Sequence, residues 1–238
     1  MKSILPFLYL YVIKINNQMS NKFHKISNED ALAFILGGKA KFTFKSLNTG
    51  VDFSFEVKDA KDKFASAKAG KTVYNPNFKF VSLFIGANQA VRGRAYAYFG
   101  TISRTKNNWG FNIAAKNQLR NENPAITAFS FVFNRLLNGV QLPTLEIWHE
   151  GRCCCCGRAL KLSESIELGW GTVCLGHRQG MREQLESDIA QRKLVAQTTL
   201  NEIKNKESIV AQVIKGVKLP QGNLFSSIPD LVPSKNKK

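Results

Sequence analysis

The sequence lacks an apolar stretch long enough to cross a bilayer. Its longest apolar run, residues 4–13, is about half of the roughly 20 residues that a membrane-spanning helix needs. A signal-peptide core has this length, but polar residues 16–18 follow the run without a small-residue cleavage site. Because Met19 opens a conventional soluble start, we interpret residues 1–18 as a translation start assigned too far upstream, and we expect no membrane partner.

Cysteine is missing from the chain outside residues 153–174, where all five cysteines lie. A secreted disulfide framework would distribute its cysteines along the sequence. Clustered cysteines are instead typical of a metal site in a reducing compartment. We therefore expect a cytoplasmic protein.

Acidic residues are scarce, with 17 Asp and Glu against 34 Lys and Arg and a net charge of +17. An excess of this size favours a polyanionic partner, with DNA or RNA ahead of a membrane surface. The alternative is a basic protein whose charge serves no ligand. The chain also lacks a P-loop, a dinucleotide-binding glycine motif, a zinc-protease helix motif and a nucleophile elbow. We therefore expect a protein without enzymatic activity ahead of an enzyme of unrecognised type, which remains the third alternative.

Alternating residues predict an antiparallel sheet. Residues 41–45 and 53–57 each alternate between apolar and polar side chains, and residues 48–50 form the turn of a hairpin with one buried face. Residues 80–85 are apolar on both faces, which indicates a central strand, and the Lys-rich residues 58–77 are interpreted as a solvated loop. Further strands are expected at residues 95–102, 109–114 and 145–148.

Helices are predicted from their caps and apolar faces. Ser27 is expected to cap a short helix that ends at Gly37 and Gly38. Asn123 and Pro124 begin a strongly apolar helix through Leu137, which we expect to pack across the sheet as the core helix. A long helical pattern from about residue 178 to residue 217 predicts a surface helix or helix pair.

The cysteines follow the spacing of a zinc finger. Cys153 and Cys156 enclose two residues, as do Cys174 and His177, and this spacing aims two side chains at one ion. Gly157 follows the first pair, where a tight turn often needs positive φ. The pattern predicts a treble-clef finger with one pair on a knuckle and the other at a helix start.

Four protein ligands would close the coordination sphere of Zn²⁺. A catalytic zinc keeps one position open for water, so this site is expected to be structural. The neighbouring Cys154 and Cys155 are interpreted as small apolar fillers or exposed thiols, with a redox pair as the alternative.

The same segment resembles a known family. Residues 148–158 read W-H-E-G-R-C-C-C-C-G-R, and residues 169–174 read G-W-G-T-V-C. This arrangement is similar to a family that is common in phage and plasmid genomes and is catalogued as a domain of unknown function. The resemblance covers residues 148–177, is looser in the preceding β-rich region, and implies a zinc fold and a mobile-element origin without any activity.

We therefore predict an α+β fold: an antiparallel β-sheet with one core helix, a treble-clef zinc module and a long C-terminal helix. The function we favour is nucleic-acid binding as an accessory to replication, transcription or processing, and the alternative is a protein-interaction module that inhibits a host factor. Candidate phosphate contacts lie beside the finger, and the loop before Tyr96 and Tyr98 adds two arginines next to rings that either stack on bases or face the core. These basic residues are Arg152, Arg158, Lys161 and Arg178 at the finger, and Arg92 and Arg94 in the loop. The expected segments are an N-terminal extension (1–18), a body (19–147), the finger (148–178), a helical segment (179–217) and a disordered basic tail (218–238).

Overall fold

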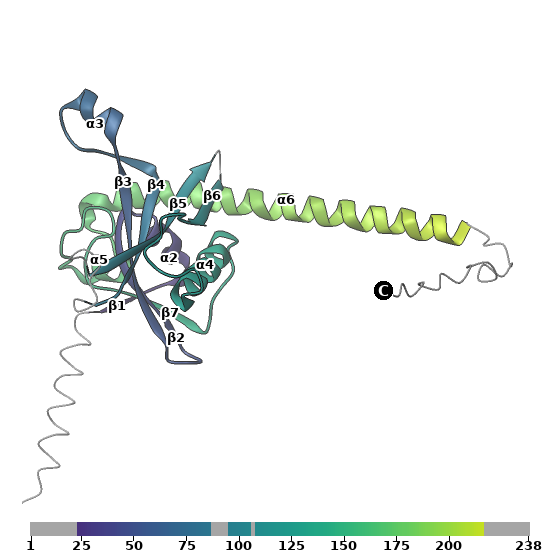
Figure 1. The fold of residues 1–238 in the computed structure, drawn as a ribbon, viewed down its shortest axis with the longest axis horizontal. Helices are drawn as coiled ribbons and strands as arrows, with labels where there is room; N and C mark the ends of the chain where they lie inside the picture. The colour runs from purple at the N-terminus through teal and green to yellow at the C-terminus, as the bar shows by residue number, and fades with distance from the viewer. Residues whose placement is uncertain (1–22, 87–94, 106–107, 217–238) are drawn as a thin grey trace, which may run out of the picture. The chain divides into compact units, whose positions relative to one another are not determined.

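The structure is a computed structural model that describes residues 23–86, 95–105 and 108–216 (Figure 1). It divides into two compact units, residues 1–193 and 194–238. The first unit contains the sheet, the shorter helices, all five cysteines and the beginning of the long helix. The predicted N-terminal extension and C-terminal tail lie outside the described residues.

One antiparallel sheet of seven strands forms the first unit, in the order β1-β7-β2-β3-β4-β5-β6. The predicted hairpin is confirmed, because β2 pairs with β3 and places Phe42 opposite Phe55 and Phe44 opposite Phe53. Strand β7 enters between β1 and β2, so the segment before the cysteines lies inside the sheet. The strands are β1 (His24–Ile26), β2 (Lys39–Ser46), β3 (Asp52–Asp62), β4 (Val73–Phe84), β5 (Tyr96–Thr105), β6 (Asn108–Ile113) and β7 (Leu145–His149).

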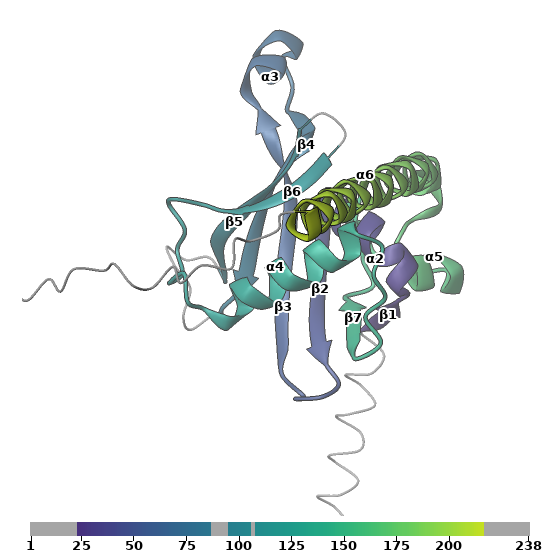
Figure 2. The same cartoon turned by 90° about the vertical axis from the view of Figure 1, so that its right-hand side faces the viewer.

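Helices cover one face of this sheet (Figure 2). The caps follow the prediction: the Ser27 side chain accepts from the backbone N–H of Asp30, and the Asn123 side chain accepts from that of Ala125. Among the described helices, none is both long and apolar enough to span a bilayer. The helices are α2 (Asn28–Ile35), α3 (Lys63–Ala69), α4 (Pro124–Leu137), α5 (Ser163–Leu168), the 3-10 turn η2 (Thr172–Cys174) and α6 (Leu175–Gly216).

Aromatic side chains fill the space under the helices. The ring of Phe129 in α4 lies 5.2 Å from that of Phe55 and 5.7 Å from that of Phe99, and all three side chains are fully buried. Burying one such side chain stabilises the fold by about 1.5–3 kcal/mol. Helix α4 is thus the core helix, although Phe131, which makes its sequence apolar on nearly all sides, is 53% exposed.

The prediction of a loop at residues 58–77 was wrong. Strand β3 continues to Asp62, β4 begins at Val73, and these two residues pair directly. The Asp62 side chain accepts from the backbone N–H of Ala65 and caps α3, which ends at Gly70 with φ of 63°. The pairing was missed because these strand ends carry lysines without the apolar alternation that identifies a strand over a core.

The first part of α6 is attached to the sheet and to α2 by arginine contacts. Arg178 and Arg182 both pair with Asp30, which lies in the first turn of α2 and accepts from the hydroxyl of the capping Ser27. Arg104 of β5 pairs with Asp188, and Arg192 donates to the backbone carbonyl of Trp109 at 2.5 Å. In the second unit, the side chains of residues 194–208 are all exposed.

Candidate functional site

The cysteine segment begins as a tight turn after β7. The backbone N–H of Cys153 donates to the carbonyl of Arg158 at 2.9 Å, and that of Gly157 donates to the carbonyl of Cys153 at 2.8 Å. Gly157 has φ of 79°, a conformation that side chains disfavour. These bonds close the knuckle predicted from the sequence.

The second part of the segment returns the chain to this knuckle. Gly169 ends α5 with φ of 70° and lies so close to Phe34 that a side chain there would collide with the ring. The fully buried Trp170 and the turn η2 then bring Cys174 beside the first cysteines. Because Cys153, Cys154 and Cys174 share one core with the sheet, this segment is part of the first unit.

Three thiols meet at this point and could hold a metal ion. The Sγ atoms of Cys153, Cys156 and Cys174 all lie within 4.8 Å of one another. Tetrahedral zinc with Zn–S bonds of about 2.3 Å holds its sulfur ligands about 3.8 Å apart. The donor set and its spacing therefore fit a thiolate metal centre.

The electrostatics of the three thiols also favour a cation. Burial alone would raise the pKa of the Cys153 thiol, but the backbone N–H groups of Cys156, Gly171 and Cys155 bond to it and lower that pKa below its usual value. Burial, together with the neighbouring Cys153, raises the pKa of Cys174 far above its usual value. Thiolates this close repel one another, which disfavours loss of the proton from every thiol. A bound cation offsets this repulsion.

His177 is not part of this group in the structure. It lies in the first turn of α6, three residues beyond Cys174, and its side chain is exposed. Among the described residues, the group with ligand atoms close together consists of the three cysteines. The role of His177 as a fourth ligand stays a prediction.

The two additional cysteines have different surroundings. Cys154 is buried, and a side chain at Gly37 would collide with its sulfur, so Cys154 fills core space as predicted. Its carbonyl also accepts from the backbone N–H of Lys39, which joins the knuckle to β2. Cys155 is half-buried, and burial raises the pKa of its thiol.

Comparison with protein families places residues 146–179 in a match to DUF6011, a family of unknown function. This match spans the end of β7, the knuckle and the start of α6. No curated protein and no solved structure matches the chain. The family thus marks the cysteine segment without assigning an activity to it.

The basic residues proposed at the finger differ in whether their side chains already bond to other groups of the protein. Arg178 pairs with Asp30, and Arg152 donates to the carbonyl of Gly157 at 3.2 Å. Both arginines thereby bond to the local fold, although Arg152 is exposed, as are Arg158 and Lys161. Arg92 and Arg94 lie outside the described residues.

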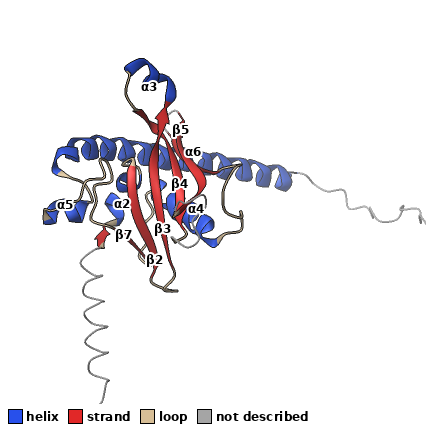
Figure 3. Ribbon diagram, turned by 60° about the vertical axis from the view of Figure 1, so that its left-hand side comes forward, coloured by secondary structure: helices blue, strands red, loops and turns tan. Residues whose placement is uncertain are grey.

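Helices lie behind the sheet and leave its other face uncovered (Figure 3), and aromatic side chains lie on this open face. Phe80 and Phe84 of β4 are 41% and 47% exposed. Residues 80–85, apolar on both faces, predicted a central strand, and β4 does lie between β3 and β5 in the sheet. The Phe80 ring packs 5.6 Å from that of Tyr98, and the Phe84 ring packs 5.3 Å from that of Tyr96. The two tyrosines therefore lie on this open face and not in the core.

Lysines surround these rings. The Nζ atom of Lys41 lies 5.0 Å from the centre of the Tyr96 ring. Lys41 and Lys58 share one acid, Glu56, at 3.6 and 2.6 Å, which leaves a net positive charge among the three groups. Burial, Glu150 and Glu56 raise the pKa of Tyr96 to about 12, so its hydroxyl remains a donor at neutral pH.

Sequence reasoning found the tyrosines but missed the phenylalanines beside them. Phe78, Phe80 and Phe84 alternate along β4 on the side opposite Val81 and Leu83. Their period of two was visible in the sequence. What was not visible is that helices cover one side of β4 alone.

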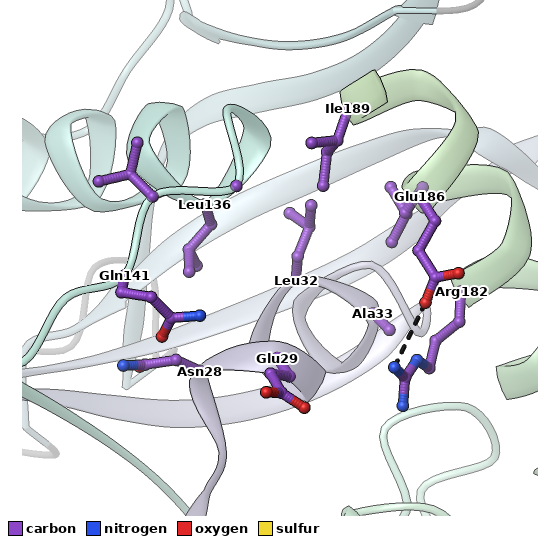
Figure 4. Close-up of a pocket in the computed structure, with 12 residues that line it drawn as sticks. Asn28, Glu29, Leu32, Ala33, Leu136, Gln141, Arg182, Glu186 and Ile189 are labelled. Carbon is purple, nitrogen blue, oxygen red and sulfur yellow. Dashed lines mark hydrogen bonds and ion pairs between the residues drawn. The ribbon is translucent and has the colours of Figure 1, made fainter. Parts of the chain in front are cut away.

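A pocket lies between α2, the end of α4 and the first part of α6 (Figure 4). Its inner surface is apolar and includes Leu32, Leu136 and Ile189. At its rim, Arg182 pairs with Glu186 and with Asp30, so its charge is already neutralised. The pocket offers no nucleophile beside a base among its lining residues.

His149 has a structural role. Its ring is fully buried between those of His24 and Phe34, and its Nε2 atom lies 2.8 Å from the carbonyl of Ile166, to which it can donate. Burial lowers the pKa of His149 to about 4, so the ring is neutral at pH 7. This bond joins β7 to α5 and holds the two parts of the cysteine segment together.

Proposed function

We propose that this protein binds single-stranded nucleic acid across the open face of its sheet. The observation that carries the proposal is the row of paired, half-exposed rings on β4 and β5. Bases stack on such rings irrespective of sequence, and each stack contributes about 1–3 kcal/mol to binding. Double-stranded nucleic acid keeps its bases inside and cannot use these rings in the same way.

The charge distribution supports the same partner. Lys41 and Lys58 flank the rings, and Lys45 is exposed on the same side of β2, where it lies opposite Asp52 and Glu146. Phosphates beside stacked bases would displace counterions from these lysines, which makes affinity dependent on salt. The excess of 34 basic over 17 acidic residues adds attraction over a longer range.

The metal centre in this proposal is a structural zinc site. Cys153, Cys156 and Cys174 would hold the ion, with His177 as the fourth ligand after its side chain turns toward the sulfur atoms. A closed set of four ligands would stabilise the knuckle and the end of β7 without taking part in a reaction. We also propose a cytoplasmic accessory role in a phage or other mobile element, on the basis of the family resemblance.

A protein partner is the second candidate function. Leu194, Val195, Leu200 and Ile203 of α6 are all exposed on a helix segment whose neighbouring side chains are exposed as well. Replacing Leu200 and Ile203 by Glu together would disrupt a protein contact at this segment. Binding to an oligonucleotide by the open face should not change.

The proposal is tested by equilibrium binding of the zinc-loaded protein to labelled single- and double-stranded DNA and RNA at several salt concentrations. Single strands should bind more tightly than duplexes of the same sequence. Phe80→Ala and Tyr98→Ala should each weaken single-strand binding by about 1–3 kcal/mol. If no single strand binds at low salt, the proposal fails and the protein-partner function is favoured.

A further inference from the structure

The strands β3 and β4 extend beyond the sheet as an arm, residues 60–75, with α3 at its tip (Figure 1). Hydrogen bonds hold the tip in one conformation: the Ser66 hydroxyl donates to the carbonyl of Val73 and accepts from its backbone N–H. Together with the Asp62 cap and the left-handed Gly70, these bonds build a folded tip rather than a loop.

This tip presents an apolar ring to solvent. Phe64 is 91% exposed, and α3 has no buried residue. Single exposed apolar residues are common on protein surfaces and indicate little alone. Here, however, four lysines lie on the same short arm as this ring, and none of them has an ion pair among the residues that the structure describes. These lysines are Lys61, Lys63, Lys68 and Lys71, and all are exposed.

The base of the arm is fixed to the sheet. The side chain of Lys79 is fully buried, pairs with Asp59 and lies 5.5 Å from the centre of the Trp109 ring. The backbone N–H of Asp59 donates to the carbonyl of Gly38 at 2.9 Å. The arm and the open face therefore share strand β4, which carries Phe80 and Phe84, although the pairing of β3 with β4 shifts register between Asp59 and Ala60 at the base of the arm.

We infer that the arm is a wedge for a nucleic-acid duplex that adjoins the bound single strand. An apolar side chain inserted at a base step unstacks it, while lysines beside it contact the phosphates. The lysines favour a polyanion as the partner, and because β4 runs from the open face into the arm, the partner would continue from the strand bound on that face. The inference rests on the proposed function, and the site it names is the junction between single and double strand.

The test compares three probes: a short single strand, a duplex, and a partial duplex with a single-stranded overhang. The wild-type protein should bind the partial duplex most tightly. Phe64→Ala should weaken this binding about tenfold, as loss of one stacking contact would, and leave single-strand binding unchanged. Leu162→Ala, which removes another exposed apolar side chain, is the matched control and should change neither.

A fluorescent base analogue at the junction reports unstacking directly. Its emission should rise when the wild-type protein binds and should stay low with Phe64→Ala, whose thermal unfolding should be unchanged. Equal partial-duplex affinity of wild type and Phe64→Ala would overturn the inference, as would Phe64-dependent binding to vesicles of anionic lipid. Loss of single-strand binding in Phe80→Ala tests the open face separately, so failure of one site is distinguishable from failure of the other.

Discussion

The two faces of the sheet use the same kind of residue in opposite ways. On the covered face, Phe55 and Phe99 pack against Phe129 of α4 and are fully buried. On the open face, Phe80 and Phe84 pack in pairs with tyrosines and remain nearly half exposed. Aromatic content alone therefore does not identify a core, because the rings on a face of the sheet are buried only where other elements cover that face.

Because of this difference, the buried rings should contribute mainly to stability and the half-exposed rings mainly to binding. A buried ring stabilises the fold in proportion to the apolar area that it removes from water. A half-exposed ring contributes less to stability and can still stack on a partner. The two faces should consequently respond differently to the same substitution.

The largest effect should follow loss of the zinc ion that we propose at the three clustered thiols. Cys153→Ser and Cys174→Ser should each remove the bound zinc, because each takes away one of the three clustered thiols. Cys154→Ser and Cys155→Ser should retain it. Metal content per chain by mass spectrometry or atomic absorption measures both, and full zinc content in Cys153→Ser and Cys174→Ser would refute the assignment.

On the covered face, Phe129→Ala should lower the free energy of unfolding by about 3–5 kcal/mol, because it opens a cavity among buried rings. Urea denaturation measures this loss. Phe131→Ala, on the same helix but half exposed, is the control and should cost much less. Similar losses in the two variants would mean that the contrast between buried and exposed rings is wrong.

On the open face, Tyr98→Ala should weaken single-strand binding by about 1–3 kcal/mol while the unfolding midpoint changes little. Tyr98→Phe keeps the ring and should restore most of the affinity. A large loss of stability without a change in binding would instead assign Tyr98 to the fold.

Charge should distinguish the open face from the finger. Lys45→Gln should reduce the slope of log K against log salt by about 0.7, the value for one phosphate contact on a single strand. Arg158→Gln, an equally exposed change at the knuckle, should leave the slope unchanged. The reverse outcome would move the nucleic acid to the cysteine segment, where the sequence had suggested contacts for Arg152, Arg158 and Lys161.

The smallest effect concerns pH and the covered face. The pKa of His149 lies near 4, below its ordinary 6.5, because the ring is buried. The unfolded chain therefore takes up the proton first, so stability should fall as pH decreases from about 6.5 toward 4 and should not depend on this group at higher pH. His149→Gln should reduce that pH dependence in denaturation curves; an unchanged dependence would assign it to other groups.

Much of the fold could be predicted from patterns of residues close together in the sequence. The caps at Ser27 and Asn123 and the alternation in β2 and β3 depend on residues close in sequence, and both were confirmed. Three of the four residues in the predicted ligand set, the cysteines, also lie together. Which face of β4 is covered depends on helices far along the chain, so the exposure of Phe80 and Phe84 was not predictable from local pattern. The arm was missed because its strands pair outside the core.

The position of His177 relative to the thiols shows the same limit. Its spacing from Cys174 is a property of the sequence, whereas the direction of its side chain depends on how α6 begins. Arg178, one residue later, was proposed as a phosphate contact, but its guanidinium pairs with Asp30 of α2. Spacing in the sequence thus indicates which residues lie close along the chain, but it does not determine where a side chain points or which group it contacts.

The central claim is that single strands lie on the open face, and photo-crosslinking tests it most directly. An oligonucleotide carrying photoreactive bases would be bound to the zinc-loaded protein, irradiated, and the crosslinked peptides identified by mass spectrometry. If single strands bind to the open face, crosslinks should form at residues 78–84 of β4 and 96–98 of β5. Crosslinks confined to the cysteine segment, or none at a concentration where the strand is bound, would contradict it.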